Sequence, residues 1–252
     1  MRRIRLTLEY DGTNYAGWQR QINAVSVQQR VEEALRRVTG EDGLTVTGAS
    51  RTDAGVHALG QNAHFDTGCR IPADKICFAL NTALPKDIRA TGSYEVSSAF
   101  HARFSALGKE YRYLFYAHPH ASALYANLCA HVIYPLDTFL MNLEAQAMLG
   151  THDFAPFAAS VSVVKDTVRT IDAISVTENP PFITLRVHGN GFLYNMVRIL
   201  AGTLQAVGTH KLESGAIARA LESKSRLDLG VTAPPQGLTL MRVDYPRELT
   251  GE

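Results

Sequence analysis

The sequence predicts an α+β fold made of two related halves, residues 1–107 and 108–252. Segments with the period of two that is typical of half-buried strands alternate, in both halves, with segments of helical period. The succession of elements is similar in the two halves, although their sequences show no repeat. No Pro- or Ser-rich linker separates them, so we expect one continuous sheet, with the ligand site in a cleft between the halves.

In the first half, apolar and polar residues alternate over residues 4–10 and predict a strand. Ser26 and Gln29 match a capping box, and helical spacing continues to Gly40, which predicts a helix over residues 27–39. The other elements expected in this half are strands at residues 44–47, 61–67 and 88–96, and a helix that starts at Pro72 and ends before Pro85.

The second half opens with a strongly aromatic strand at residues 109–116. Asp137 is expected to cap a helix that reaches Gly150, and the polar, proline-containing residues 152–157 are expected to form a loop. The remaining predictions are strands at residues 168–176, 182–188 and 238–244, a long helix opened by residues 189–191 that contains Arg198, and a helix from Ser214.

Length and composition describe an ordinary globular protein. The chain has 252 residues, of which 46% are hydrophobic and 19% charged, so it can bury a substantial core. No apolar run approaches the roughly 18 residues of a membrane span, and no leader segment is expected. Three cysteines without metal-type spacing indicate a reducing, cytoplasmic setting.

Residues 48–58, GASRTDAGVHA, combine more chemical groups than any other short stretch of the chain. Glycines at both ends favour a loop that can approach a ligand closely, not a helix. Asp53 follows the cation Arg51 by two residues, so a carboxylate with an arginine available to keep it ionised is presented from this loop. Such an acid can act as a nucleophile or a base, or it can simply hold its own loop together by turn hydrogen bonds.

Two further patterns are compatible with RNA binding, and each also has a structural explanation. Arginines account for 19 of the 25 basic residues, and their planar fork suits phosphate, although genome composition explains the same bias. Tyrosines alternate with cations over residues 109–116, which suits base stacking or an aromatic core strand with charges at its edge. Trp18 lies in a polar, aromatic loop, where core packing is the favoured role.

Several reaction classes do not fit the sequence. Tyr194 stands where a dinucleotide-binding fingerprint requires its third glycine, and no Walker loop is found. Asp53 and His57 would align as metal ligands only on a helix, so no metal site is expected. A nucleophile elbow has a glycine two residues away on each side of its serine, and Ser50 does not meet this requirement. The chemistry that remains is that of a single carboxylate, Asp53, presented from a loop. Arg198 could approach this carboxylate from the second half.

The loop sequence GASRTDAGVHA closely resembles the signature of the tRNA pseudouridine synthase A (TruA) family. The resemblance covers nearly the whole chain, with matching segments in the expected order at residues 10–19, 27–28, 100–106, 109–113, 152–154, 191–202 and 233–238. It implies two pseudo-symmetric, ferredoxin-like halves that share an extended, mainly antiparallel sheet with helices on one face. Departures from the family pattern are minor: Ser26 replaces a common threonine and preserves the capping hydroxyl.

The resemblance also implies a function. The expected reaction converts uridine to pseudouridine at positions 38, 39 and 40 of the tRNA anticodon stem-loop, without metal or cofactor. Asp53 would be the catalytic carboxylate, Tyr111 would stack on the target uracil, and Arg198 would orient and ionise Asp53. Arg51 would hold the displaced backbone of the flipped nucleotide. The partners implied are tRNA and a second copy of the chain in a homodimer.

The sequence leaves some alternatives open. Asp53 could attack the sugar or the base covalently, or it could remove a sugar proton to give a glycal intermediate. A non-catalytic tRNA-binding protein with the same fold is a rival from another class, and it would not need Asp53. His57 is assigned to the structure of the loop and not to proton transfer.

Overall fold

The computed structural model describes residues 1–159 and 166–250. The chain forms two compact units. The first comprises residues 1–109 and 240–252, and the second comprises residues 110–239.

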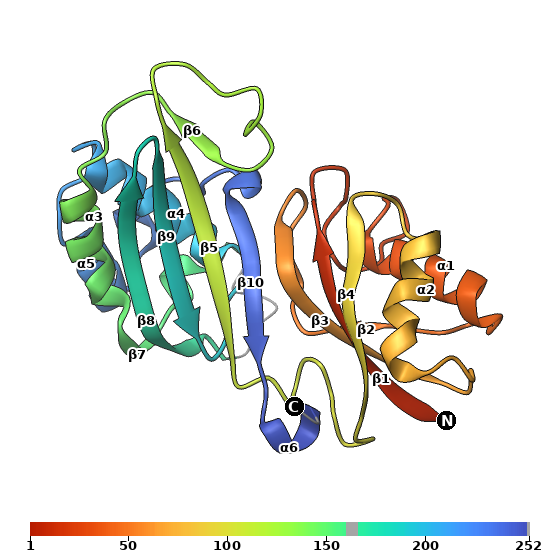
Figure 1. Cartoon of the computed structure of the whole chain (residues 1–252). Coiled ribbons are helices and arrows are strands. Elements are labelled where there is room, and N and C mark those ends of the chain that lie inside the picture. Colours follow the sequence, from red (N-terminus) through yellow and green to blue (C-terminus); the bar gives the residue numbers. More distant parts are fainter. Residues whose placement is uncertain (160–165, 251–252) are drawn as a thin grey trace. The chain divides into compact units, whose positions relative to one another are not determined.

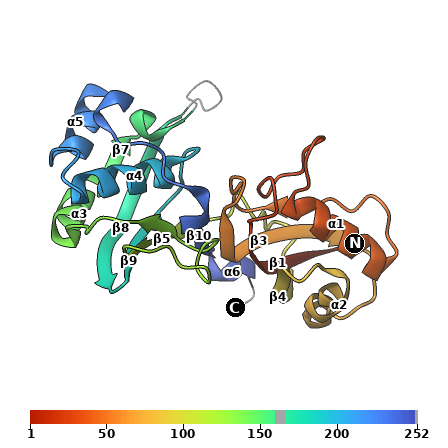
Figure 2. The same cartoon turned by 90° about the horizontal axis from the view of Figure 1, so that it is seen from above.

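The first unit is built on three long antiparallel strands with two helices beside them (Figure 1). Strand β1 (Arg2–Tyr10) lies between β4 (Ile88–Val96) and β3 (His57–Thr67), and the short β2 (Thr47–Gly48) pairs with β3. Helix α1 (Val27–Thr39) contacts α2 (Ile76–Ala83), which follows the 3-10 segment Ala73–Lys75 (Figures 1 and 2). The short helix α6 (Arg247–Thr250) contacts β4.

The period of two along β1 decides which side chains form the core of the first unit. Ile4, Leu6 and Leu8 are fully buried, while Arg3 and Thr7 on the other face are partly accessible. Arg5 on that face is also buried, and its guanidinium lies over the ring of Tyr94. Ser26 caps α1 by accepting a hydrogen bond from the Gln29 backbone N–H at 3.3 Å, and Gly40 ends the helix in the left-handed conformation at φ 71°. The predicted limits of this helix are therefore confirmed.

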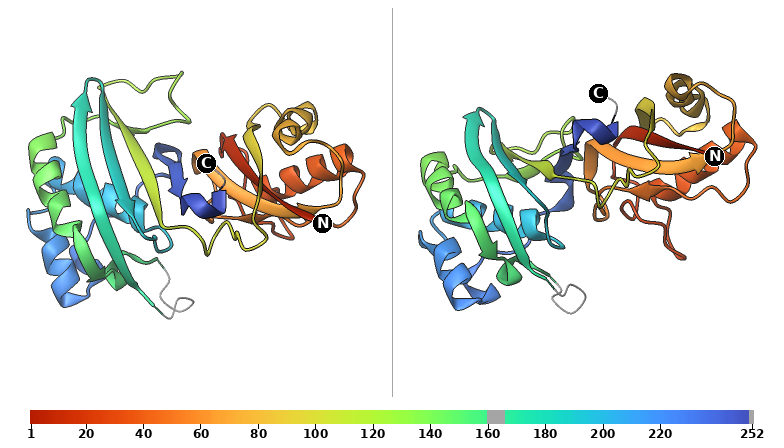
Figure 3. Two further views of the ribbon diagram at one scale, coloured as in Figure 1. Left: turned by 60° about the horizontal axis from the view of Figure 1, so that its bottom comes forward. Right: turned by 90° about the horizontal axis from the view of Figure 1, so that it is seen from below.

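The second unit contains strands β5, β9, β8 and β7, which are hydrogen-bonded in that order. These are β5 (Gly108–Ala117), β9 (Phe182–Gly189), β8 (Val168–Asn179) and β7 (Gly150–Asp153), and β6 (Ala130–Val132) adds to β5 in parallel. Helix α3 (Thr138–Ala145) contacts β8 and both α4 (Met196–Gly208) and α5 (Ala216–Ser223) (Figures 1 and 3). The 3-10 segments of this unit are Gln146–Met148, Ala155–Phe157, Arg226–Asp228 and Pro235–Gly237.

Strand β10 (Leu238–Asp244) contributes residues to both units. It hydrogen-bonds with β3 in the strand order of the first unit and with β5 in that of the second. Apart from β6, the pairs whose register is defined among the described residues are antiparallel. The predicted α+β class with a shared, mainly antiparallel sheet is confirmed.

Several predictions of local structure need correction. Of the strand expected at residues 44–47, only Thr47 belongs to a strand, β2. The reason is that side chains of α1 bind both backbone groups of Val46. Its N–H donates to Glu32 Oε1 at 3.1 Å, and its carbonyl accepts from Gln28 Nε2 at 3.0 Å. Strand β3 begins at His57, four residues earlier than predicted, because Ala58 pairs with Tyr10.

The third correction concerns residues 152–157, which were expected to form a loop. His152 and Asp153 belong to β7, which pairs with β8 through His152 opposite Arg169. The sequence also gave no sign of β6, whose three residues are held by the parallel pairing with β5. Helix α4 starts at Met196 rather than at residues 189–191, because Asn195 adopts a left-handed conformation at φ 62°.

Candidate active site

The loop that carries Asp53 is held at its base by β3. The Gln61 side chain bonds to both backbone groups of Ser50: Nε2 donates to the carbonyl at 2.7 Å, and Oε1 accepts from the N–H at 3.2 Å. The Ala49 N–H donates to the Asn62 carbonyl at 2.7 Å. Because Gln61 is fully buried, its amide is fixed, and the loop leaves the strand in a defined direction.

Asp53 itself opens a tight turn. The Val56 N–H donates to the Asp53 carbonyl at 3.1 Å, and Gly55 takes φ 77° at the third position of the turn, which is a conformation that favours glycine. The neighbouring Thr52 is buried, and its hydroxyl lies 2.8 Å from that of Tyr10. Asp53 is half-buried between this anchor and the exposed Ala54, so the turn presents its carboxylate near the surface of the first unit.

A second segment, residues 11–18, supports the back of the Asp53 loop. The Trp18 N–H donates to the Thr52 carbonyl at 3.1 Å, and the Gly55 N–H donates to the Tyr15 carbonyl at 3.3 Å. Gly17 approaches so closely that a Cβ atom there would lie 2.4 Å from the Thr52 carbonyl oxygen. The two segments therefore form one backbone-to-backbone layer that fixes the position of Asp53.

The environment of Trp18 and His57 agrees with the structural roles predicted for them. Trp18 is buried, and its indole packs where a Cβ on Gly48 would lie. His57 is buried, and its Nδ1 accepts a hydrogen bond from the Gly12 N–H at 3.1 Å. Nδ1 also lies 3.1 Å from Asp11 Oδ1. A nitrogen that accepts a hydrogen bond from the Gly12 N–H cannot also donate one to Asp11. The backbone hydrogen bond is the dominant contact of this nitrogen, because His57 is buried.

Two cationic side chains lie at the loop, those of Arg51 and Lys109. Arg51 is exposed, so its guanidinium is free to adjust its position and bind a phosphate of a polyanionic ligand. The Lys109 Nζ donates to the Ala49 carbonyl at 2.8 Å and brings a second positive charge to the start of the loop. Sequence reasoning missed Lys109, because the residue is 60 positions away from Ala49 along the chain.

Tyr111 and Arg198 belong to the second unit. Tyr111 is 6% exposed, and its ring packs edge-on against Phe192 with centroids 5.1 Å apart. On the same strand face, Tyr113 and Phe115 are fully buried. The prediction of an aromatic core strand is therefore correct for these two residues, and Tyr111 stands at the end of their row.

Arg198 lies in the first turn of α4 and is held in a fixed orientation. Its Nε donates to the Ala233 carbonyl at 2.8 Å, and its NH1 donates to Asn195 Oδ1 at 2.8 Å. The Tyr113 hydroxyl donates to the next carbonyl, that of Pro234, at 2.7 Å. Burial raises the pKa of Tyr113, so this phenol stays a neutral donor. Arg198 and Tyr113 thus share one short segment as their support, a link that the sequence did not reveal.

The structure therefore places Asp53 and Arg51 on one loop of the first unit, and Tyr111 and Arg198 in the second unit. Among residues 1–159 and 166–250, no group of three His, Cys, Asp or Glu side chains could hold a metal ion. In the same part of the chain, no helix is long and apolar enough to cross a membrane.

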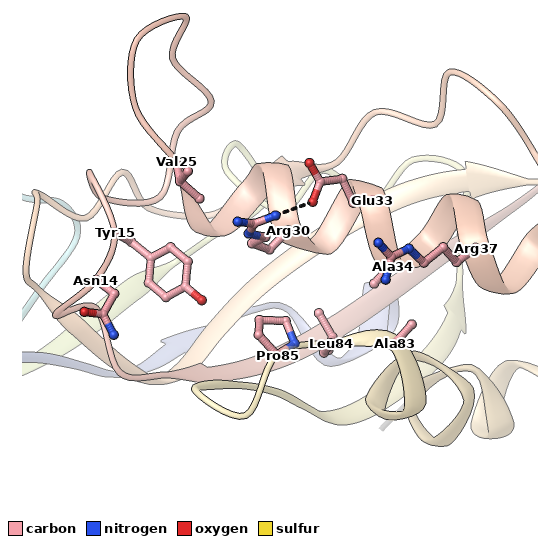
Figure 4. A pocket seen from close by; sticks show the side chains of 10 residues that line it. All are labelled: Asn14, Tyr15, Val25, Arg30, Glu33, Ala34, Arg37, Ala83, Leu84 and Pro85. Carbon is pink, nitrogen blue, oxygen red and sulfur yellow. Dashed lines mark hydrogen bonds and ion pairs between the residues drawn. The ribbon is translucent and has the colours of Figure 1, made fainter.

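A pocket of about 420 Å³ lies elsewhere on the first unit, between α1, residues 14–25 and the end of α2 (Figure 4). Arg30, Glu33 and Arg37 of α1 line it, and Arg30 is paired with Glu33 at 2.8 Å. The Tyr15 hydroxyl donates to Asp87 Oδ1 at 2.6 Å, and burial together with this bond raises the pKa of the phenol. None of the four predicted site residues lines the pocket.

Comparison with known proteins identifies the family. Residues 7–105 and 145–246 match the tRNA pseudouridine synthase family. The tRNA pseudouridine synthase A of Ruminiclostridium cellulolyticum is 50% identical over 246 residues, which cover 97% of this chain and 100% of that protein. The corresponding protein of Thermoanaerobacter pseudethanolicus is 46% identical over 245 residues, with the same coverage.

Among solved structures, a chain from a Cbf5-Nop10-Gar1 complex is 12% identical and has a TM-score of 0.39. The match covers 94% of this chain and 48% of that chain, so the present protein spans about half of its length. The match over most of the sequence and the identity of 46–50% to full-length relatives are decisive. The chain belongs to the tRNA pseudouridine synthase family.

Proposed function

We propose that this protein isomerises uridine to pseudouridine at positions 38, 39 and 40 in the anticodon stem-loop of tRNA, with Asp53 as the catalytic carboxylate. The observation that carries the proposal is the fixed loop around Asp53, which presents a half-buried carboxylate from a backbone held by Gln61, Tyr10 and residues 11–18. An acid that must act on one atom of a flipped nucleotide needs such a preorganised support.

The chemistry requires little beyond this carboxylate. Uracil is detached from the ribose at N1, rotated, and rejoined through C5, so the product is an isomer of the substrate and no energy donor is consumed. Asp53 either forms a covalent bond to the sugar or the base, or removes a sugar proton to give a glycal intermediate. In each route the site must retain the free base until the new bond forms, and it must exclude water.

The other three residues receive supporting roles in this proposal. Tyr111 stacks on the target uracil, and its edge contact with Phe192 keeps the ring in place. Arg198, already oriented by Ala233 and Asn195, keeps Asp53 ionised and aligned. The exposed Arg51 holds the sugar-phosphate backbone of the displaced nucleotide.

The remaining features of the proposal concern partners and setting. The protein acts on tRNA as a homodimer in the cytoplasm, and the chain halves at residues 1–107 and 108–252 act together on one substrate. The reducing setting is proposed from the cysteine content, because Cys69, Cys77 and Cys129 are an odd number without metal-type spacing.

The test replaces Asp53 by asparagine, which has the same shape but no charge. Asp53→Asn should bind an anticodon stem-loop transcript with a Kd within about threefold of wild type and form no pseudouridine. Product is measured by mapping pseudouridine in the transcript, and binding is measured separately by fluorescence anisotropy. Substantial turnover by Asp53→Asn would refute the assignment. Absence of product with the wild-type protein on every transcript would instead favour a non-catalytic RNA-binding role.

A further inference from the structure

A pair of stacked rings, one half-buried and one exposed, lies on the first unit, in the segment at residues 97–106 between β4 and β5. The rings of His101 and Phe104 are stacked, with centroids 4.3 Å apart and planes inclined by 28°. Phe104 is 76% exposed, and the Arg103 guanidinium carbon lies over its ring, 5.7 Å from the centroid. We call the side chains of His101, Arg103 and Phe104 the stacking platform.

The segment that carries the platform is firmly attached to the unit. The Arg3 guanidinium donates to the carbonyls of Ser98 and Phe100 at 2.6 and 2.8 Å, and Phe100 is fully buried. Ala102 is held on both sides: its N–H donates to His64 Nδ1 at 3.1 Å, and its carbonyl accepts from the Tyr245 hydroxyl at 2.6 Å. The exposure of Phe104 is therefore a property of an ordered segment and not of a loose one.

The orientation of the His101 ring is also fixed. Its Nδ1 accepts from the N–H groups of both Arg103 and Phe104 at 3.2 Å, and the His101 N–H donates to Ser105 Oγ at 3.0 Å. Burial and the nearby Arg3 charge lower the pKa of His101. The two stacked rings thus form a preorganised aromatic surface, and no ligand has to order them before binding.

The charge beside the rings indicates the chemistry of the partner. Arg103 forms no ion pair with a side chain in the part of the chain that the structure describes. An exposed aromatic face next to an unneutralised guanidinium suits a ligand that has both a π-face and a phosphate. An apolar protein surface would satisfy the ring but would bury the charge without a partner.

We propose that the stacking platform binds an unpaired base of the RNA substrate at a site separate from that of the target uridine. The platform is linked to β3 at His64, seven residues beyond His57, where the Asp53 loop enters the strand. The Asp53 loop is bonded to the same strand at Gln61 and joins it at His57, whereas the platform segment is bonded at His64. Because the two segments are attached to different residues of β3, we assign the stacked base and the base at Asp53 to different nucleotides. This inference about the stacking platform rests on the proposed function in one respect only, which is that the RNA is tRNA.

The experiment compares Phe104→Ala, Phe104→Trp and Arg103→Gln with the control Phe78→Ala. Phe78 is a matched control, because it is 67% exposed and lies 5.6 Å from the cation Lys75, but it belongs to α2. The probes are an anticodon stem-loop transcript and a blunt duplex of the stem alone, with Kd measured by anisotropy at several salt concentrations. Trp18 is buried, so a new tryptophan at position 104 reports contact with RNA through its own emission.

Phe104→Ala should raise the Kd for the stem-loop about tenfold and the Kd for the duplex less than twofold, with kcat at saturating RNA unchanged. Phe104→Trp should keep the wild-type Kd, and its emission should be quenched by the stem-loop. Arg103→Gln should reduce the slope of log Kd against log salt by roughly one. Phe78→Ala should change none of these values.

A Kd for Phe104→Ala within twofold of wild type would overturn the proposal, and so would an equal loss of affinity for stem-loop and duplex. Molecular mass is measured by light scattering without RNA: if Phe104→Ala halves it, the platform is a contact with a second copy of the chain and the proposal is wrong. Binding is scored independently of product. Wild-type protein that makes no pseudouridine would therefore refute the proposed function and leave the platform to be judged by Kd.

Discussion

Replacing Gly17 by alanine tests whether the layer behind the loop positions Asp53. Gly17 has φ 85°, a conformation that costs an L-residue about 1–2 kcal/mol. Its added Cβ would also lie 2.4 Å from the Thr52 carbonyl oxygen and 3.0 Å from the Asp53 carbonyl carbon. Ordinary contact begins at about 3.4 Å, so the Thr52 carbonyl must move by about 1 Å, and Asp53 is the next residue.

Gly40→Ala is a control that separates backbone strain from the close contact of the added Cβ atom. It has φ 71° at the end of α1, and a Cβ there would meet nothing within 4 Å. Gly40→Ala should therefore lower the free energy of unfolding by about 1–2 kcal/mol through backbone strain alone. Gly17→Ala should lower it by a further 1–3 kcal/mol, roughly the cost of forcing atoms into a packed site.

The effect on catalysis should be larger than the effect on stability. A displacement of about 1 Å in a catalytic group can cost about 100-fold in rate, so kcat of Gly17→Ala should fall by about that factor while Gly40→Ala keeps the wild-type kcat. Urea midpoints give the stability of both variants, and single-turnover assays on the stem-loop transcript give the rate. If Gly17→Ala is as active as Gly40→Ala, the contact with Thr52 does not control the position of Asp53.

Two further predictions concern Tyr111 and His64. Tyr111→Phe should retain most of the wild-type turnover and Tyr111→Ala should lose it, because the stacked ring survives only in the first variant; equal turnover would remove the stacking role. Burial, together with the charges of Arg3 and His101, lowers the pKa of His64 to about 4. The unfolded chain binds this proton near pH 6.5, so stability should fall by up to about 3 kcal/mol between pH 6.5 and 4. His64→Asn keeps an acceptor for the Ala102 N–H and should flatten this pH dependence of the urea midpoint; an unchanged profile would contradict the assignment.

The parts of the fold that the sequence predicted well are those with signals in their own residues. Helix α1 has a capping serine, a buried stripe and a terminal glycine within 15 residues, and strands β4 and β10 have the predicted limits. The short strands β2, β6 and β7 have no such pattern. Their extent depends on partners far along the chain, such as Glu32 for Val46 and β5 for β6, and no local rule contains that information.

The same distinction applies to the candidate site. The Asp53 loop could be singled out because its glycines, hydroxyls and charges are consecutive. The residues that support this loop could not be predicted, because Gly12, Gly17 and Lys109 contact it only in the folded chain. His57 was assigned to the structure of the loop, and its hydrogen-bond partner, the Gly12 N–H, lies 45 residues away along the chain. The roles of Asp53, Tyr111, Arg51 and Arg198 stay predictions, and the variants above test those of Asp53 and Tyr111.

Burial alone does not single out Asp53, the proposed catalytic carboxylate. Glu144 is more deeply buried than Asp53, yet it accepts hydrogen bonds from Ser214 Oγ and from the N–H groups of Gly215 and Ile217, so it fixes the start of α5. Glu32 is also buried and holds the Val46 N–H and the Gln28 amide. Both of these carboxylates support a backbone, and the backbone of the Asp53 loop is supported by Gln61, Tyr10 and residues 11–18. A group that must react needs its position fixed from outside, because its own oxygens must be able to exchange their contacts for those of the substrate.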